Sequence, residues 1–439
     1  MSAALELRAH GLSVTVADDQ PAPGGRIFAG IESRDTHGPE DQGGAALVTR
    51  FRREGGEYLP ATEAWGIEAA PRVFLTRNGT ATLLEPRFVL LATGAQERPM
   101  PFPGWQLPGV MTVGAAQIVL KTAKQIPDRP VWLAGSGPLL LLYARQLIRA
   151  GGTVAGILDT TPPGRVGAAI GLIPGALHYG WRDLLRGLGW LAKMRGIKVI
   201  RDVRSLEARG NGALSTVRYA TRDGASGEIE TSLLLIHDGV VPAVHATMAA
   251  ECRHRWNPAQ RSFEPVLDEF RASSNPAIYV AGDAASIAGA RAAIFSGRLA
   301  AIGIARAAGK LTTEQAYAAA RPIRAKLASA AGFRVLIDTL YPPAELAIPD
   351  TTMVCRCEEI TAGQVRAALK NRRQLGPDGV KMETRAGMGP CQGRQCGLSL
   401  TRLAAELHAM DPEDVGFLRI RSPLKPLTLG ELASLETAS

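Results

Sequence analysis

The stretch VWLAGSGPLL at residues 131–140 decides the fold of this 439-residue chain. Its first four residues are apolar and predict a buried β-strand, and its glycines predict a tight turn. An apolar helix is then predicted from Leu139 to Arg149. A strand, a glycine turn and a helix in this order open a dinucleotide-binding unit, in which the helix N-terminus faces a phosphate. The stretch therefore predicts an α/β fold built on parallel strands.

The same pattern, an apolar strand that runs into a turn, recurs along the chain. Further strands are predicted at Val14–Ala17, Phe88–Ala92, Leu233–Ile236 and Ala277–Ala281. Alternation of such strands with helices is typical of doubly wound parallel sheets, and the length indicates two to four domains. A helix and a proline-containing linker are predicted from about residue 319 to residue 347.

The first residues predict the second half of another dinucleotide-binding unit. A helix is predicted from Met1 to His10, and the strand after it ends at Asp18, where the acidic residue that binds ribose is expected. No strand and no G-x-G-x-x-G loop precede Met1 in this sequence. The pattern favours a start placed too late, at an internal methionine. The alternative is a protein that lacks half of the usual phosphate-binding site.

The glycine loop at 135–140 departs from the nucleotide fingerprint. Leu140 stands where glycine or alanine allows close packing of helix on strand. Asp159 lies near the place expected for a ribose-binding carboxylate. The departure favours a retained Rossmann fold with no bound nucleotide, or with a different one, over productive NAD(P) binding.

Four of the five cysteines crowd near the C-terminus in two pairs: Cys355, Cys357, Cys391 and Cys396. Structural zinc sites usually take thiolates from C-x2-4-C pairs, whereas the tighter C-x-C pair fits one edge of a planar 2Fe–2S cluster. The second pair lies in the glycine-rich segment 387–397, where backbone N–H groups can approach sulfur. Helices are predicted beside the two pairs, one from about Ala362 to Asn371 with Thr361 as N-cap and one from about Leu398 to Met410. No histidine lies in residues 351–400, which argues against a Rieske-type centre. An iron–sulfur cluster is favoured; zinc, or redox or structural thiols, are the alternatives.

Composition excludes several functions. The net charge of +9 is spread along the chain without a basic block, so a nucleic-acid partner is not expected. The longest apolar run, residues 131–143, is too short to span a bilayer, and no signal peptide is evident. The sequence predicts a cytoplasmic protein without a transmembrane segment and leaves open a peripheral association with a membrane. The seven histidines are scattered, and no catalytic residue is identified.

Three further segments carry a resemblance to two-dinucleotide-domain, glutathione-reductase-like flavoproteins. They are the strand exit at Thr93-Gly94, the run from Pro103 to Val110, and the Ala281-Gly282-Asp283 signature. With the PAPGGRI stretch at 21–27 and the cysteine pairs, nearly the whole chain resembles the A chain of heteromeric opine (octopine or nopaline) oxidases. It is also similar to the B chain of hydrogen cyanide synthase and to the alpha chains of proline and hydroxyproline dehydrogenases. The cysteine module resembles bacterioferritin-associated ferredoxin.

The resemblance implies two Rossmann-type sheets, a small helical C-terminal domain, bound FAD and a 2Fe–2S cluster held by the four paired cysteines. A second nucleotide or an interface FMN is a weaker implication. The implied FAD-binding residues are Asp18, Gly24, Gly25, Arg26, Ala64, Thr93, Gly94, Gly282 and Asp283. The implied division is a first segment of the FAD-binding domain at 1–112, a second Rossmann-like domain at 113–248, a second segment of the FAD-binding domain at 249–318, a helix and linker at 319–347, the cluster domain at 348–410 and a tail at 411–439.

The implied function is that of an electron-transferring subunit in a complex that oxidises a C–N bond of an amino acid, imino acid or opine. An amine-oxidase-like flavoprotein and a small ferredoxin-like chain are the implied partners, and the substrate is expected to react in the partner. The alternatives are an NAD(P)H-dependent flavin/iron–sulfur reductase, a component of hydrogen cyanide synthase and a flavin-free scaffold. The sequence leaves the substrate, the electron acceptor and the stoichiometry open.

Overall fold

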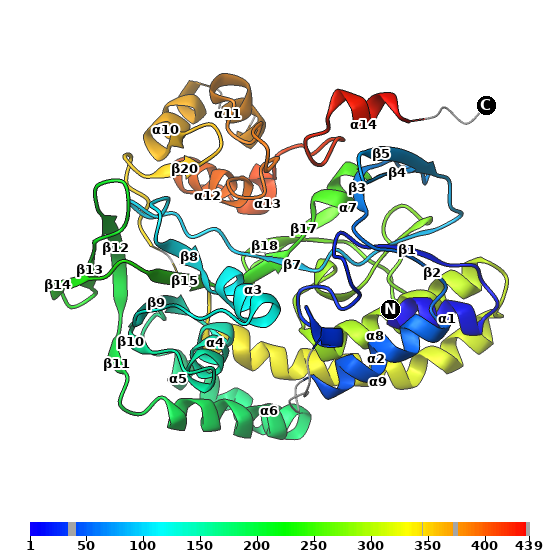
Figure 1. Cartoon of the computed structure of the whole chain (residues 1–439), viewed down its shortest axis with the longest axis horizontal. Helices are drawn as coiled ribbons and strands as arrows, with labels where there is room; N and C mark the ends of the chain where they lie inside the picture. Colours follow the sequence, from blue (N-terminus) through cyan, green and yellow to red (C-terminus); the bar gives the residue numbers. More distant parts are fainter. Residues whose placement is uncertain (34–40, 345, 372–375, 436–439) are drawn as a thin grey trace.

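The computed structural model describes residues 1–33, 41–344, 346–371 and 376–435. Two α/β bodies lie side by side, and a small helical module sits against them at one end (Figure 1). The C-terminal segment runs from this module back across the body that contains the N-terminus. The chain is thus arranged as two α/β bodies with a third, helical unit at their boundary.

The second body is a five-stranded parallel sheet with the strand order β11-β10-β9-β15-β8. The fold-deciding strand lies at its centre and is buried along its whole length, because α3 (Val113–Ala123) and α4 (Pro138–Arg149) cover one face. An antiparallel three-stranded sheet packs on the other face. The strands of the parallel sheet are β8 (Val110–Thr112), β9 (Val131–Ser136), β10 (Val154–Asp159), β11 (Lys198–Ile200) and β15 (Leu234–Asp238); those of the antiparallel sheet are β12 (Val203–Arg209), β13 (Thr216–Thr221) and β14 (Ser226–Glu230).

The first body has its parallel strands in two separate ladders. One joins β1 (Thr15–Ala17) to β2 (Glu57–Leu59), and the other joins β6 (Val89–Leu91) to β19 (Ile278–Val280). No described strand pairs with both ladders, so the first predicted sheet is divided. The short remaining strands are β3 (Glu63–Ile67), β4 (Val73–Arg77) and β5 (Thr80–Leu84) in one antiparallel sheet, β7 (Ala95–Glu97) with β16 (Val240–Pro242), and β17 (His254–Asn257) with β18 (Ser262–Pro265).

Helices cover the first body on one side (Figure 1). The predicted first helix is α1 (Ser2–Ala9), which packs on α8 (Ala290–Ala307), and Arg298 Nε of α8 donates to Glu6 at 2.8 Å. The helix expected near residue 319 begins earlier, at Thr313, because Thr312 and Gln315 form a capping box. The remaining helices of the two bodies are α2 (Gln42–Glu54), α5 (Arg165–Ala169), α6 (Ile173–Lys193), α7 (His245–Ala249) and α9 (Thr313–Leu340), with 3-10 turns η1 (Ile31–Ser33), η2 (Ile170–Leu172) and η3 (Gly282–Ala284).

The helical module holds all four paired cysteines. A short hairpin, β20 (Met353–Cys355) with β21 (Ile360–Thr361), leads into α10 (Ala362–Asn371), which has the predicted bounds. The helix predicted from about residue 398 is α12 (Gly397–His408). The sequence did not predict α11 (Gly376–Thr384) or α13 (Pro412–Val415). Buried aliphatic side chains of α10, α11 and α12 form one core that continues into β6, β19 and α7.

The tail beyond residue 416 lies along the sheet of β3, β4 and β5. Leu424 N donates to Trp65 O at 2.6 Å, and Lys425 Nζ pairs with Glu63. The short helix α14 (Leu429–Ala433) is tied to the same sheet where Thr76 Oγ1 donates to Glu431 at 2.9 Å. The tail therefore links the helical module to the first body. The last four residues of the tail, 436–439, lie outside the described residues.

Candidate functional site

The four cysteines of the module come from two segments, the β20–β21 hairpin and the loop before α12. Cys355 ends β20, Cys357 follows in the hairpin turn, and the second pair lies in the loop that leads into α12. Cys355 and Cys396 are buried, Cys391 is half-buried and Cys357 is exposed. All four are free thiols.

The thiols stand in two cross-segment pairs. Cys355 hydrogen-bonds with Cys396, and Cys357 hydrogen-bonds with Cys391. The contact with Cys396, together with nearby backbone N–H groups, lowers the pKa of Cys355 to about 6, whereas the same contact and burial raise the pKa of Cys396. Among the described residues, no three Cys, His, Asp or Glu side chains gather as tightly as one ion requires. The two thiol pairs would supply the four thiolates that a 2Fe–2S cluster takes.

The glycine-rich loop approaches the cysteines through its backbone, as predicted. A Cβ atom at Gly389 would lie 2.2 Å from the Cβ of Cys357, closer than two carbon atoms can come without a shift. Gly387 and Gly393 have φ values of +90° and +81°, which glycine adopts at little cost. The loop can therefore keep this course only with glycine at these places.

Of the three arginines near the cysteines, Arg394 lies against the loop itself. Its Nη1 donates to Leu424 O at 2.9 Å and to Cys391 O at 3.3 Å. Arg385 is paired with Glu358 at 3.0 Å, and the guanidinium of Arg356 lies over the ring of Trp105 at 5.2 Å. Arg394 is therefore the best placed of the three to balance the negative charge of a thiolate-bound cluster.

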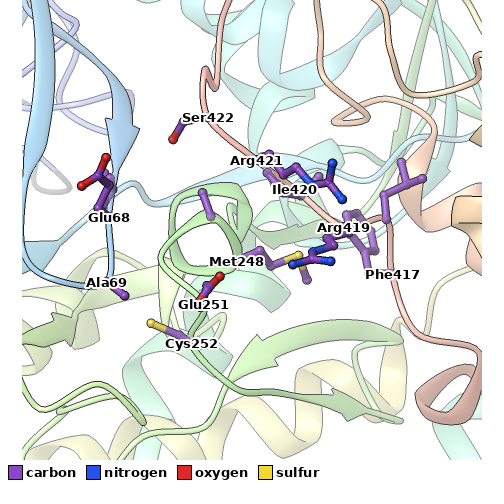
Figure 2. Close-up of a pocket in the computed structure, with 13 residues that line it drawn as sticks. Glu68, Ala69, Met248, Glu251, Cys252, Phe417, Arg419, Ile420, Arg421 and Ser422 are labelled. Atoms are coloured by element: carbon purple, nitrogen blue, oxygen red, sulfur yellow. The ribbon is translucent and has the colours of Figure 1, made fainter.

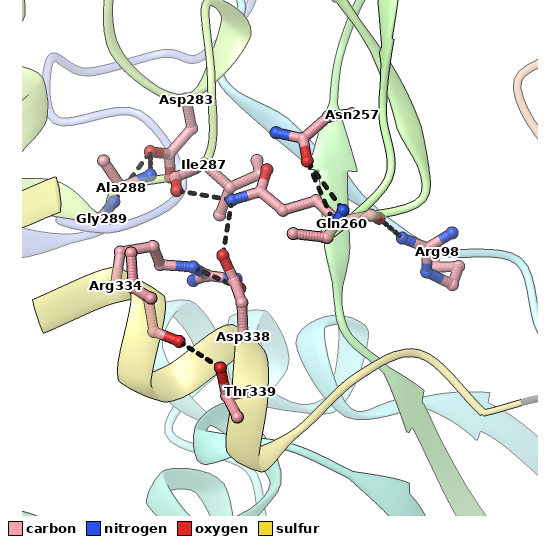
Figure 3. Close-up of polar contacts among 12 residues, drawn as sticks. Arg98, Asn257, Gln260, Asp283, Ile287, Ala288, Gly289, Arg334, Asp338 and Thr339 are labelled. Atoms are coloured by element: carbon pink, nitrogen blue, oxygen red, sulfur yellow. Dashed lines mark hydrogen bonds and ion pairs between the residues drawn. The ribbon is translucent and has the colours of Figure 1, made fainter. Parts of the chain in front are cut away.

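The FAD signatures lie at the carboxyl edge of the β6–β19 ladder. Because these strands are parallel, Thr93-Gly94 after β6 and Gly282-Asp283 after β19 emerge at the same end. Gly94 and Gly282 have φ values of +70° and +69°. Asp283 Oδ1 accepts bonds from the backbone N–H groups of the loop before α8, Ala288 at 3.0 Å and Gly289 at 2.9 Å (Figure 3).

The PAPGGRI turn comes to the cluster loop. A Cβ at Gly24, whose φ is +136°, would lie 2.8 Å from Phe28 O, so glycine is required there. Gly25 also has a positive φ, +56°. Burial lowers the pKa of Arg394, and the nearby charge of Arg26 lowers it further. Arg26 therefore lies within electrostatic range of Arg394, although the two are far apart in the sequence.

Asp18 and Ala64 stand at two other places in the first body. Asp18 follows β1, and its carboxylate accepts bonds from Gln20 N at 3.0 Å and from the Tyr58 hydroxyl at 3.3 Å. Burial raises the pKa of Asp18. Ala64 is exposed on β3, next to the strand residues that contact Leu424 and Lys425 of the tail.

Direct contacts join the flavin segment to the cysteine loop. Gln96, two residues after Gly94, donates through Nε2 to Arg394 O at 3.0 Å. Trp105 donates through Nε1 to Met353 O at 2.7 Å, which fixes the Pro103–Val110 run to β20. Neither side chain was predicted as a link, because their partners lie more than 200 residues away. The one signal in the sequence was that Gln96 and Trp105 both follow the Thr93-Gly94 signature.

A second polar cluster connects the Asp283 loop to the other body (Figure 3). Gln260 Nε2 donates to Ile287 O at 3.1 Å and to Asp338 at 3.2 Å. Arg98 is buried; it donates to the backbone oxygens of Gln260, Arg261 and Asp238, the last at 3.1 Å. The flavin-signature loop, α9 and β15 are therefore held by one network, which the sequence did not predict either.

The glycine loop of the second body has a structural explanation. A Cβ at Gly135 would lie 1.7 Å from His237 O, so the close approach of the neighbouring strand β15 requires glycine at this position. Leu140 is a buried residue in the first turn of α4, and this helix begins with Pro138, which has no N–H to offer an anion. Asp159 Oδ1 already accepts a bond from Thr161 N at 2.9 Å. These features agree with the departure from the nucleotide fingerprint noted in the sequence.

A pocket of about 600 Å³ opens between β3, α7 and the tail (Figure 2). Arg419, Arg421 and Glu251 border it, and Met248 and Phe417 form part of its apolar wall. None of the predicted FAD residues or paired cysteines lines it. The pocket is therefore distinct from the junction of flavin segment and cysteine loop. No helix within the described ranges has both the length and the apolar character that a bilayer crossing needs.

Comparison with known proteins agrees with this arrangement. The BFD-like 2Fe–2S binding domain matches residues 353–406. The A chain of opine oxidase from Rhizobium meliloti is 40% identical over 99% of this chain and 85% of its own length. The HcnB chain of hydrogen cyanide synthase from Pseudomonas aeruginosa is 31% identical over 100% of this chain and 97% of its own length. The structure of L-proline dehydrogenase from P. horikoshii has a TM-score of 0.71 at 21% identity, covering 98% of this chain and 76% of that one.

Two dinucleotide-binding folds joined to a BFD-like module define an FAD-dependent oxidoreductase with a 2Fe–2S cluster. Within this class the chain belongs to the family of opine oxidase A chains. The predicted family, fold class and cofactors FAD and 2Fe–2S are confirmed, and the matched module covers all four paired cysteines. The chain is thus a dehydrogenase subunit with a role in electron transfer.

Proposed function

We propose that this chain is the electron-transferring subunit of a heteromeric dehydrogenase whose substrate is oxidised in a partner chain. The bond oxidised is a C–N bond of an opine, amino acid or imino acid, and an opine is the first choice because relatives about 40% identical carry that name. The partners we propose are an amine-oxidase-like flavoprotein and a small ferredoxin-like chain. The hydrogen bond from Gln96 to the Arg394 carbonyl carries the proposal, because it joins the flavin segment to the cysteine loop.

The first body supplies the groups that would hold FAD. We assign Asp18 to the ribose hydroxyls and Asp283 to the ribityl chain, because each lies at the carboxyl end of a parallel strand. Gly24, Gly25 and Gly94 would let the backbone approach the cofactor, and Arg26 adds a positive charge within electrostatic range of Arg394. Thr93, Gly282 and Ala64 complete the proposed contact surface.

The module supplies the ligands of the cluster, Cys355, Cys357, Cys391 and Cys396. FAD takes up two electrons together and gives them up singly, and a 2Fe–2S cluster carries one at a time. The chain's own residues hold the two sites at a fixed separation: Gln96 and Trp105 bind the cysteine loop and β20 to the flavin segment. The burial of Cys355 and Cys396 would keep water from their thiolates in a bound cluster, while Cys357 is exposed at the surface where a partner can dock.

The rival function, a reductase that takes electrons from NAD(P)H, has less support. Such an enzyme needs a free phosphate site at the start of α4. Here Pro138 removes one N–H from that site, and Leu140 fills the place of the third fingerprint glycine. We therefore propose that the second body serves the assembly of the complex or binds a nucleotide other than NAD(P).

The test compares the purified chain with the chain co-purified with its proposed partner under anaerobic conditions. An opine such as octopine is added, and the absorbance of the flavin and the cluster is followed. We expect bleaching of both chromophores in the complex and none in the isolated chain, while NADH bleaches neither within the same time. Bleaching of the isolated chain by NADH would establish the rival reductase, and bleaching by the opine would place substrate oxidation in this chain.

A matched pair of variants separates the cluster from the rest of the protein. In a complex that carries Cys357→Ser, the opine should still bleach the flavins, but reduction of an artificial one-electron acceptor should fall by about tenfold or more. Cys252→Ser should leave both steps unchanged, because Cys252 is buried in the first body and hydrogen-bonds with Ser273 at 3.3 Å. Equal acceptor reduction in both variants would contradict a route through the cluster.

A further inference from the structure

One helix carries its apolar side chains on the outside. Of the 22 large apolar side chains that are exposed in the described part of the chain, nine lie within residues 166–191. They belong to α5, the η2 turn and α6, which lie along the outer margin of the molecule beside α9 (Figure 1). The nine are Val166, Ile170, Ile173, Leu177, Tyr179, Trp181, Leu185, Leu188 and Leu191. Solitary exposed apolar residues are ordinary on proteins, but a continuous set of this size marks an interaction site.

The inner face of α6 is already occupied. Ala176 is buried with Leu336 of α9, and Gly180, where the helix bends, lies against the ring of Phe333. Ser329 of α9 donates to Tyr179 O at 3.1 Å. The helix is therefore held in place by its small residues, and the large residues remain on the side that faces away from the core.

The exposed residues form one stripe. Trp181, Leu185 and Leu188 follow one another at intervals of four and three, which places them on one side of α6 after its bend at Gly180. Leu177, which is 50% exposed, precedes the bend. Leu185 and Leu188 are 57% and 54% exposed, and Trp181 is 51% exposed. Arg182 and Arg186 continue the surface at the edge of this stripe, and both are exposed.

The charge around the stripe is strongly positive. Residues 165–198 contain six Lys and Arg residues and a single acidic residue, Asp183. Asp183 is paired with Arg186 at 3.0 Å and with Arg291 at 3.2 Å. A second copy of the chain would bring the same excess of positive charge and be repelled, whereas an anionic surface is attracted. Leucine and tryptophan on one side and arginine beside them are the pattern of helices that lie in a membrane interface.

We propose that α6 is a membrane-contact helix that lays its Trp181–Leu185–Leu188 stripe into an anionic phospholipid bilayer. The basic residues beside the stripe bind the lipid headgroups. The helix lies in the plane of the interface and stays packed on α9. This inference rests on α6 alone and does not depend on the proposed function of the junction between flavin segment and cysteine loop.

The test is flotation of the full-length chain with lipid vesicles. The wild type should float with vesicles that contain phosphatidylglycerol, and should float less with phosphatidylcholine alone or at raised salt. Leu185→Glu/Leu188→Glu should lower the vesicle partition coefficient by about tenfold or more. The matched control is Leu429→Glu/Leu432→Glu on α14, where the two leucines are also exposed, at 85% and 50%; it should bind as the wild type does.

A conservative variant distinguishes loss of membrane contact from misfolding of the glutamate variant. Quenching of tryptophan fluorescence by brominated lipid should be largely lost in Trp181→Phe, which keeps the fold and the binding. Failure of the wild type to float, undiminished flotation of the Leu185/Leu188 variant, or an equal loss in the α14 control would overturn the proposal. So would wild-type oligomers that lack vesicle binding and that dissociate in the Leu185/Leu188 variant, since the stripe would then be a protein interface.

Discussion

Gly389 shows how a single residue without a side chain determines the geometry of the cysteine site. The backbone of the second cysteine segment passes so close to Cys357 that a methyl group at Gly389 would lie 2.2 Å from the Cβ of that cysteine. Both segments must therefore separate if any side chain is added. The glycine-rich sequence around Cys391 and Cys396 is therefore needed for the close approach of this segment to Cys357 as well as for its turns.

We predict that Gly389→Ala lowers the iron and sulfide content of the purified chain by about half or more, because it separates two of the four ligands. Iron and acid-labile sulfide are measured against protein. Gly43→Ala is the control, since a Cβ there meets no atom within 4 Å. Full iron content in Gly389→Ala would contradict the close approach of the two segments.

His254 gives the protein a predictable dependence on pH. Burial lowers the pKa of His254 from 6.5 to about 4, and its ring nitrogens contact the Thr247 hydroxyl and Cys252 O, each at 2.8 Å. The unfolded chain takes up a proton near pH 6.5, whereas the folded chain does so only near pH 4. The stabilisation is therefore present above pH 6.5 and is lost as the pH falls through this window.

We predict that between pH 7 and pH 5 this group alone lowers the free energy of unfolding by about 2 kcal/mol. Urea unfolding at the two pH values measures the loss in the wild type and in His254→Asn, which keeps a hydrogen-bonding group but does not titrate. The loss in the variant should be smaller by about that amount. Equal losses in the two proteins would show that His254 is protonated alike in both states.

At the scale of elements, Arg98 joins pieces that the chain order keeps apart. It follows β7, its guanidinium bonds to backbone oxygens after β17 and at the end of β15, and Asp238 of β15 lies 3.9 Å from its Nε. Burial lowers the pKa of Arg98 to about 10, so it stays charged at neutral pH. Removal of this cation leaves several buried oxygens and one buried carboxylate without their partner.

We therefore predict that Arg98→Met lowers the free energy of unfolding by about 3–5 kcal/mol. Arg50→Met, which breaks an exposed pair with Glu54 on α2, should leave the free energy of unfolding close to that of the wild type. Denaturant unfolding of both variants measures the difference. Similar losses of stability at the two positions would show that the buried network of Arg98 stabilises the fold no more than a surface ion pair does.

The elements that could be predicted from the sequence are those whose signal is local. The strand and turn at 131–140, the helix from Ala362 to Asn371 with its Thr361 and Gln364 capping partners, and the cysteine pairs all carry their pattern within a few residues. The long helix α6 was not predicted, because its bend at Gly180 breaks the period and its apolar residues face outward. Gln96 and Trp105 were missed because a link between distant segments leaves no local pattern.

At the scale of the whole molecule, the position of the cluster module depends on a small number of contacts. Trp105 from the first α/β segment donates to Met353 O, Gln96 donates to the cysteine loop, and Arg402 of α12 donates to Leu346 O at 2.8 Å. The module also shares an apolar core with β6 and β19. These contacts hold the cysteine loop beside the flavin segment.

We predict that Trp105→Phe, which removes the indole N–H and leaves Met353 O without its donor, weakens this docking by about 1–2 kcal/mol. Cleavage by a protease in the linker before residue 353 should then be faster by about tenfold, because cleavage follows the population of the opened state. Trp181→Phe is the control, since Trp181 is exposed on α6. Cleavage of Trp105→Phe at the control rate would mean that the contact does not hold the module.

FAD and a 2Fe–2S cluster should both be bound by one chain, at the junction of its first body and its helical module. The most direct test is an anaerobic absorption spectrum of the purified chain, with released flavin, iron and sulfide measured on the same sample. We expect about one flavin, two irons and two sulfides per chain. Iron and sulfide without flavin, or zinc in place of iron, would contradict it.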